Sequence, residues 1–156
     1  MMASLMTTRP EIVAYLPMHG PYDQIPEGFG RLYAWIERHE HKATGMPTAV
    51  YFNVPSDESA SDAVWELRAP IAGDLSDAPP DEDGIGVRSV PAIDVITAVH
   101  KGPYDSVLPT YQALWGWIED NGYEPCGPPM ERYLNDPGKT HPAEALTEVL
   151  MPVKKA

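Results

Sequence analysis

The stretch that decides the fold is residues 100–133, HKGPYDSVLPTYQALWGWIEDNGYEPCGPPMERY, because the first half of the chain contains the same pattern again. Gly20-Pro21-Tyr22-Asp23 matches Gly102-Pro103-Tyr104-Asp105, and we call this spacing (102 − 20 = 82) the repeat offset. The repeat offset links further identical pairs: Leu32 and Leu114, Trp35 and Trp117, Ile36 and Ile118, Tyr51 and Tyr133, Asn53 and Asn135, Glu66 and Glu148, Pro70 and Pro152. A gapless period this long predicts an internal duplication with two structural halves rather than a solenoid.

Composition narrows the class of protein. The chain has 156 residues, of which 43% are hydrophobic, and a net charge of −12 from 11 basic and 23 acidic residues. We expect no direct binding of nucleic acid or of an anionic membrane, since both need a basic surface. No stretch approaches the roughly 20 apolar residues of a membrane span, and the N-terminus lacks the apolar region of a secretory signal. These features predict a cytoplasmic protein.

The duplication predicts how the chain is organised. Its length suits one domain. We expect this domain at residues 9–156, with repeats at 9–72 and 87–154. An acidic, proline-rich linker at 73–86 joins the repeats and contains almost no core residues. Residues 1–8 are expected to form a loose tail.

Each repeat has the pattern of a βαββ unit. Strands are expected at residues 11–16, 48–54, 63–71, 87–90, 92–99, 130–135 and 145–153, and amphipathic helices at 24–40 and 105–121. A turn is expected at Asp136-Pro137-Gly138. The predicted class is α+β: an antiparallel sheet with two helices on one face, and a ligand cleft between the halves along a pseudo-twofold axis.

Local signals refine the two helices. Asp105 or Ser106 is expected to cap the start of the second helix, and Gly122 to follow its end. In the first helix, Gly28 and Gly30 are each expected to cost ~1 kcal/mol relative to alanine.

Two glutamates are candidates for chemistry. Glu131 and Tyr133 lie two residues apart on an expected strand, so their side chains share a face. Glu148 shares a face with Leu146 and Leu150, where a carboxylate is out of place in a plain core. Two interpretations stay open for each glutamate. Either it is exposed at a strand edge or end, or it lies at the floor of a cleft, where it must be paired, hydrogen-bonded or protonated. There it would attract a cation or act as a general acid or base.

Aromatic residues favour such a cleft. The chain has four tryptophans and eight tyrosines but only two phenylalanines. Trp and Tyr combine a large apolar area with a polar atom and can hold cations over their rings. Packing in the core is the alternative for each of them, and Tyr104 in particular could pack its turn against the sheet. The candidate ligand-binding residues are Glu131, Glu148, Tyr133, Tyr104, Trp117, Trp65 and Tyr51.

Other kinds of site have little support. The single cysteine, Cys126, excludes an internal disulfide, and no His or Cys cluster has the spacing of metal ligands. No phosphate-binding loop, dinucleotide-binding motif or nucleophile elbow is present. We therefore expect neither a metal nor another cofactor.

The order and spacing of several short motifs resemble the GyrI-like small-molecule-binding domain, the effector-binding domain of multidrug-responsive regulators. These motifs are Val99 to Tyr104, Trp117-Ile118 with Asn121-Gly122-Tyr123, Gly127-Pro128, Glu131 to Leu134, Asp136-Pro137, Thr147-Glu148-Val149 and Pro152-Val153. The resemblance implies a duplicated βαββ fold of the SHS2 type with a cleft between the halves. It also implies binding of lipophilic cations by aromatic side chains and a buried glutamate, and Glu131 and Glu148 match the family's acidic positions. Some members are similar to cyclopropanoid hydrolases, which use pocket glutamates and aromatic residues.

One departure bears on function. Regulators of this family carry a separate DNA-binding domain, and no helix-turn-helix fits before residue 9, so we do not expect this chain to be such a regulator itself. The candidate protein partners are DNA gyrase, a separate regulator or a second copy of the chain.

Three functions stay open. The first is a module that binds a hydrophobic, cationic small molecule. The second is a hydrolase of cyclopropanoid electrophiles, in which Glu131 and Glu148 position or activate water and Tyr133 polarises the substrate. The third is inhibition of gyrase through an exposed surface, which should tolerate Glu131→Gln. We favour binding, because it requires only the cleft and not carboxylates aimed at a reacting atom.

Overall fold

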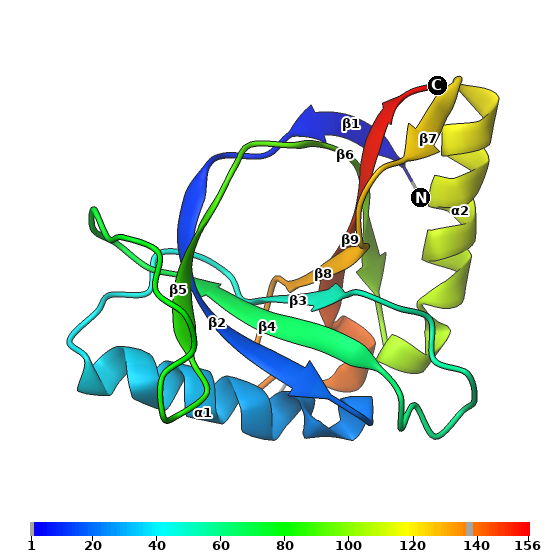
Figure 1. The fold of residues 1–156 in the computed structure, drawn as a ribbon. Coiled ribbons are helices and arrows are strands. Elements are labelled where there is room, and N and C mark those ends of the chain that lie inside the picture. Colours follow the sequence, from blue (N-terminus) through cyan, green and yellow to red (C-terminus); the bar gives the residue numbers. More distant parts are fainter. Residues whose placement is uncertain (1, 137–138) are drawn as a thin grey trace. The chain divides into compact units, whose positions relative to one another are not determined.

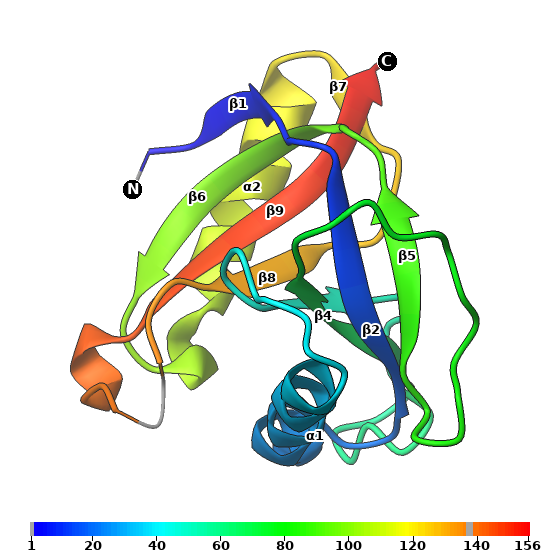
Figure 2. The same cartoon turned by 90° about the vertical axis from the view of Figure 1, so that its left-hand side faces the viewer.

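The computed structural model describes residues 2–136 and 139–156, which contain nine β-strands and two α-helices (Figures 1 and 2). The chain separates into two compact units, which we describe one at a time. Unit 1 contains Met1–Arg9 and Ala92–Ala156, and unit 2 contains Pro10–Pro91. All strand pairings within the described part of each unit are antiparallel. The predicted α+β class is confirmed.

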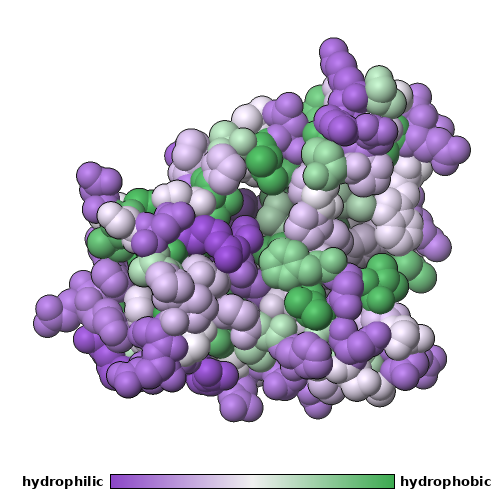
Figure 3. Space-filling model, in the orientation of Figure 1, coloured by the Kyte–Doolittle hydropathy of each residue, from purple (hydrophilic) through white to green (hydrophobic). Residues whose placement is uncertain are grey.

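Unit 2 is a four-stranded sheet with one helix on one face. The strand order is β3-β4-β2-β5. Its elements are β2 (Glu11–His19), the short 3-10 helix η1 (Tyr22–Gln24), α1 (Ile25–Arg38), β3 (Thr48–Tyr51), β4 (Val64–Pro70) and β5 (Gly86–Val90). The apolar stripe of α1 buries Leu32, Trp35 and Ile36, while its opposite face is charged, which gives the largely hydrophilic surface at the lower left of Figure 3.

Unit 1 repeats this plan with one more strand. The order is β1-β6-β9-β8, and β7 also pairs with β9. Its elements are β1 (Ser4–Thr7), β6 (Asp94–Lys101), η2 (Tyr104–Ser106), α2 (Leu108–Asp120), β7 (Tyr123–Pro125), β8 (Met130–Tyr133), η3 (Pro142–Glu144) and β9 (Leu146–Lys155). The core lies between α2 and the sheet and is formed by Ile96, Ala98, Leu114, Ile118, Val149, Met151 and Val153.

Backbone pairing follows the repeat offset in both units. Each central strand has equivalent partners: Glu66 of β4 lies opposite Pro17 and Val50, and Glu148 of β9 lies opposite Val99 and Arg132. The turn before each helix is held the same way, because Gly20 N donates to Ala63 O and Gly102 N to Ala145 O. Both glycines have a positive φ, +94° and +123°, which other residues rarely adopt. The duplication therefore extends to individual hydrogen bonds.

Two strands pair in a unit other than the one that their place in the sequence suggests. β1 comes just before the first predicted repeat but pairs with β6 in unit 1, and β5, at the start of the second predicted repeat, pairs with β2 in unit 2. The two pairings are equivalent, since Thr7 lies opposite Asp94 and Ser89 opposite Ile12. The prediction that residues 1–8 form a loose tail is wrong: the pairing partner of Ser4–Thr7 lies far away in the sequence, where local propensity cannot reveal it.

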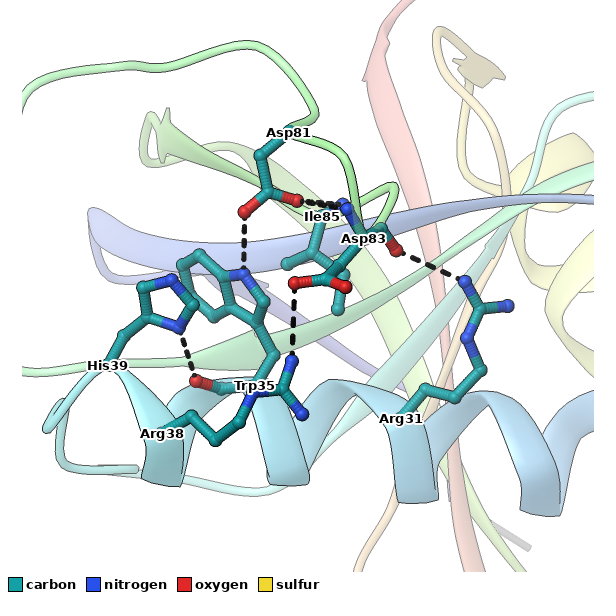
Figure 4. A network of polar contacts seen from close by, with 7 residues as sticks. All are labelled: Arg31, Trp35, Arg38, His39, Asp81, Asp83 and Ile85. Carbon is teal, nitrogen blue, oxygen red and sulfur yellow. Dashed lines mark hydrogen bonds and ion pairs between the residues drawn. The ribbon is translucent and has the colours of Figure 1, made fainter.

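The acidic connector at residues 73–86 is packed against α1 (Figure 4). Asp81 Oδ2 accepts a hydrogen bond from Trp35 Nε1 at 2.9 Å, and Asp83 pairs with Arg38 at 3.2 Å. The Trp35 hydrogen bond lowers the pKa of the Asp81 carboxyl, so this contact forms with the ionised side chain at neutral pH. Ile85 is buried, so the expectation that this segment holds almost no core residues is wrong at that position.

Two local predictions have different outcomes at the ends of α2. Gly122 follows the helix with φ of +72°, as predicted. The predicted N-cap is wrong: Val107 occupies that position and no side chain caps the helix, because the chain enters α2 through η2, which contains Ser106. The predicted turn at residues 136–138 lies largely outside the described residues.

We predict opposite effects of alanine at two glycines of α1. A Cβ on Gly28 would lie 2.5 Å from Leu67 Cδ1 in the core, whereas a Cβ on Gly30 meets nothing within 4 Å. Gly30→Ala should raise the free energy of unfolding by about 0.5–1 kcal/mol. Gly28→Ala should lower it by about 1–3 kcal/mol through overpacking. Urea unfolding followed by circular dichroism measures both, and equal stabilisation by the two variants would contradict the packing of α1 on β4.

Candidate functional site

A pair of tyrosines occupies the same place in each unit. Tyr22 and Tyr51 meet edge to face in unit 2, with ring centroids 5.3 Å apart, and Tyr104 and Tyr133 do so in unit 1 at 5.6 Å. The second pair follows the first by the repeat offset. Tyr104 packs its turn against the sheet, because Tyr133 belongs to β8. This packing was the alternative to a ligand contact of Tyr104, and the ligand contact stays a prediction.

The residue beside each tyrosine pair differs between the units. In unit 2 it is Trp65, which is 1% exposed, packs against Tyr22 and donates from Nε1 to Gly20 O at 2.8 Å. In unit 1 the equivalent residue is Thr147, which is also buried but much smaller. The core of unit 2 is thus filled with an indole where unit 1 has a hydroxyl.

Glu131 lies on the α2 side of the unit 1 sheet. It is opposite Val149, a core residue, and its neighbour Tyr133 is opposite Thr147 on the same face. The hydroxyl of Tyr111 on α2 donates to Glu131 Oε2 at 2.5 Å. Glu131 is half-buried, so it is neither a fully exposed strand-end residue nor an isolated buried charge.

The negative charge of Glu131 contributes to a raised pKa of the Tyr104 phenol. Burial raises the pKa of Tyr104 above its ordinary value of 10.0, and the charges of Glu131 and Asp136 raise it further, while the hydroxyl of Thr147 partly offsets the rise. Tyr104, Tyr111, Glu131 and Tyr133 therefore form one acidic and aromatic cluster in unit 1, which we call the tyrosine–glutamate site.

Glu148 lies on the opposite face of the same sheet. It is paired across the strands with Arg132, one residue out of phase with Glu131 and Tyr133. Thr97 Oγ1 donates to Glu148 Oε2 at 3.0 Å, and Arg132 lies 3.5 Å from Oε1. The edge interpretation is wrong for Glu148, because β9 lies between β6 and β8 and the side chain is 16% exposed. Unit 1 does not bring Glu131 and Glu148 together.

The remaining predicted site residues are spread over both units. Trp117 is half-buried beside the core of unit 1 and packs on Tyr123, with ring centroids 5.2 Å apart. Trp117 therefore lies at the border of the core face of α2. Tyr51 and Trp65 belong to unit 2, on the α1 side of its sheet.

Sequence reasoning missed a charged cluster in unit 2. Glu66, the repeat equivalent of Glu148, is buried and binds both Arg68 and Arg88. The guanidinium of Arg88 also lies over the ring of Tyr15, 4.1 Å from its centroid. The sequence could have indicated Glu66, because the repeat offset pairs it with Glu148, which was already a candidate.

The structure also bears on other classes of site. In the part of the chain that it describes, no group of three or more His, Cys, Asp or Glu residues could hold a metal ion. Among the same residues, no helix is long and apolar enough to cross a membrane.

The fold defines a class: an α+β domain built from two equivalent units. The chain belongs to the GyrI-like family, since the model of the GyrI-like small molecule binding domain matches residues 1–154. A DNA gyrase inhibitor from Erwinia billingiae (strain Eb661) is 30% identical over 140 residues, which cover 88% of this chain and 87% of that protein.

Solved structures agree with this membership. The crystal structure of the EcmrR C-terminal domain is 26% identical, with a TM-score of 0.77 over 99% of this chain and 98% of that one. In an EcmrR–DNA complex solved by cryo-EM, the TM-score is 0.84, and this chain spans 58% of the EcmrR chain. SAV2435 bound to tetraphenylphosphonium shares the fold at 15% identity, with a TM-score of 0.59 over 99% of this chain and 94% of that one.

We predict that Glu131→Gln moves the pKa of Tyr104 downward without restoring its ordinary value, because burial is the larger cause of the rise. Since the folded-state pKa lies above the unfolded one, the stability contributed by neutral Tyr104 is full below the unfolded pKa and is lost as pH rises through the folded pKa. Nuclear magnetic resonance of isotope-labelled tyrosine, assigned with Tyr104→Phe, follows the titration. An unchanged pKa in Glu131→Gln would contradict the proximity of the two groups, and Glu119→Gln on the exposed face of α2 is the matched control.

Proposed function

We propose that this chain binds hydrophobic, cationic small molecules, and that the tyrosine–glutamate site of unit 1 holds the cation. The observation that carries the proposal is the position of Glu131 among three tyrosines: Tyr111 hydrogen-bonds to it, Tyr104 responds to its charge, and Tyr133 shares its face of β8. A carboxylate supplies the attraction for a positive charge, and tyrosine rings supply apolar contact together with cation–π attraction.

The geometry favours a delocalised or quaternary cation over a small hydrated one. Glu131 is half-buried and already accepts a hydrogen bond, so a ligand that needs several strong hydrogen bonds would find few acceptors there. A bulky cation with its charge spread over apolar groups loses little hydration on binding and is well matched by rings. The net charge of −12 adds a long-range attraction for cations.

Glu148 supports binding from the other face of the sheet. Its carboxylate has one threonine hydroxyl and one arginine at 3.5 Å, which leaves it acceptor capacity. We assign it the role of a second anionic contact for ligands that reach that face. Trp117 is proposed as a further ligand contact in unit 1, whereas Trp65 and Tyr51 lie in unit 2 and are not part of the cation site that we propose.

Relatives support the ligand class and a biological role. SAV2435 was solved with tetraphenylphosphonium, an aromatic cation, and EcmrR was solved on DNA. A domain of this family that binds lipophilic cations fits sequestration of such compounds or their sensing. Hydrolysis by a pair of glutamates is less favoured, because Glu131 and Glu148 lie on opposite faces of the unit 1 sheet.

We predict that tetraphenylphosphonium binds the wild-type chain and that Glu131→Gln weakens binding roughly tenfold, which corresponds to about 1.4 kcal/mol. Glu148→Gln should weaken it less. Isothermal titration calorimetry measures each affinity, and Glu119→Gln removes the same charge from an exposed position of α2. Equal affinities of Glu131→Gln and Glu119→Gln would show that charge alone attracts the cation and that the tyrosine–glutamate site is not its site.

A second candidate function is contact with DNA gyrase, favoured by the relative that is called a DNA gyrase inhibitor. If this chain inhibits gyrase through an exposed surface, the wild type and Glu131→Gln should inhibit DNA supercoiling equally. A gyrase assay with purified chain tests this. Loss of inhibition in Glu131→Gln would instead connect the tyrosine–glutamate site to gyrase.

A further inference from the structure

Unit 2 carries a cluster with the opposite charge balance, formed by Tyr15, Glu66, Arg68 and Arg88, which we call the arginine cluster. Arg68 Nε lies 2.5 Å from Glu66 Oε2, and Arg88 Nη1 lies 3.0 Å and 3.1 Å from the two carboxylate oxygens. Two guanidinium groups therefore share one carboxylate, which leaves the cluster with a net charge of about +1. This is unexpected in a chain whose net charge is −12.

The cluster lies on the face of the unit 2 sheet opposite α1. Leu67 points toward α1, where it meets Gly28, so its neighbours Glu66 and Arg68 on β4 point the other way. Arg68 is paired with Tyr15 across β2, and Arg88 with Val13. The same face holds Val50, opposite Glu66, and Thr48, opposite Arg68, so the charges have both apolar and polar neighbours.

Most donors of the two arginines are not used. Arg68 is 15% exposed and Arg88 38% exposed at the side chain. Within residues 2–136 and 139–156, Arg68 hydrogen-bonds through Nε alone and Arg88 through Nη1 alone. A guanidinium has five N–H donors. The Arg68 nitrogens Nη1 and Nη2 are not among the buried side-chain atoms without a partner, so their four N–H groups reach solvent and are open to a ligand.

Comparison with unit 1 shows that the arginines are specific to unit 2. By the repeat offset, Glu66 corresponds to Glu148, but Arg68 corresponds to Leu150, Arg88 to Met6 and Tyr15 to Thr97. The shared backbone plan does not require arginines there, because unit 1 folds the same way without them. One carboxylate also needs only one guanidinium to be neutralised, so the second cation exceeds what Glu66 requires.

We propose that the arginine cluster binds an organic anion, a small molecule with a carboxylate, sulfonate or phosphate group on an apolar body. The anionic group accepts hydrogen bonds from Nη1 and Nη2 of Arg68 and from the outer edge of Arg88, in the forked geometry that guanidinium offers to oxyanions. The apolar body lies against Val13, Val50 and Tyr15. An inorganic oxyanion lacks this body and binds more weakly.

Two acidic residues near the arginine cluster lower its affinity for an anion. Glu66 competes with the ligand for the same donors, and Glu11 lies on the same face, diagonal to Arg88 across the β2–β5 pair. Both acids disfavour a second anion, so the site has modest affinity and is sensitive to salt. Removing the charge of Glu66 is therefore expected to strengthen anion binding. A merely structural role of the cluster predicts no such gain.

Calorimetric titration with naphthoate tests the proposal, with uncharged naphthamide and inorganic phosphate as comparison ligands. Wild-type chain should bind naphthoate at least tenfold more tightly than either, roughly the difference that one good charged contact makes. Arg88→Gln should lower the affinity for naphthoate about tenfold and Arg88→Lys should lower it less, whereas Glu66→Gln should raise it. Arg9→Gln, at an exposed position, removes the same positive charge and should change nothing.

Two results would overturn the proposal that the arginine cluster binds an organic anion. One is equal binding of naphthoate and naphthamide, and the other is a naphthoate affinity that Arg88→Gln leaves unchanged. Thermal unfolding of every variant shows whether it is folded, and if Glu66→Gln is not, the half-exposed Arg88 variants and the comparison ligands still decide. Because the arginine cluster shares no residue with the tyrosine–glutamate site, tetraphenylphosphonium binding is unchanged in Arg88→Gln, and either proposal can fail alone.

Discussion

The antiparallel register of β4 and β9 is the constraint on which the rest of the structure depends. Each is a central strand, and its pairing fixes which residues face the helix and which face away. In β4, Leu67 enters the core under α1 while Glu66 and Arg68 point to the other face. A slip of one residue would move Glu66 under the helix and Leu67 away from it, so burial of the apolar set determines the register.

The two units share this backbone arrangement but differ in their side chains. Both have the tyrosine pair, and both have a glutamate at the equivalent position on the face of the sheet away from the helix. Unit 2 fills its core with Trp65 and surrounds its glutamate with two arginines. Unit 1 has Thr147 in place of the tryptophan and adds Glu131 among tyrosines. Duplication thus supplies two copies of one backbone, and substitution at a few positions gives one unit a cluster with excess positive charge and the other an acidic and aromatic cluster.

Much of the fold follows from the sequence, because the repeat offset aligns two independent sets of strand and helix signals. Pairings between distant segments do not follow. The strand Ser4–Thr7 has no strong local signal and is defined only by its pairing with β6. The opposite orientation of Glu131 and Glu148 likewise depends on the pairing of β8 with β9, which no single strand pattern contains. Glu66 could have been found, since its repeat equivalent was already a candidate, but its arginine partners come from a second strand.

The central claim is that each unit has its own ligand site and that the two sites have opposite charge preferences. Amide chemical shifts of labelled wild-type chain, recorded with tetraphenylphosphonium and separately with naphthoate, test it most directly. The account predicts that the cation shifts amides around Tyr104, Tyr111 and β8, and that the anion shifts amides around Tyr15, β4 and β5. Shifts of the same amides by both ligands would contradict two separate sites and indicate one site that selects for apolar character alone.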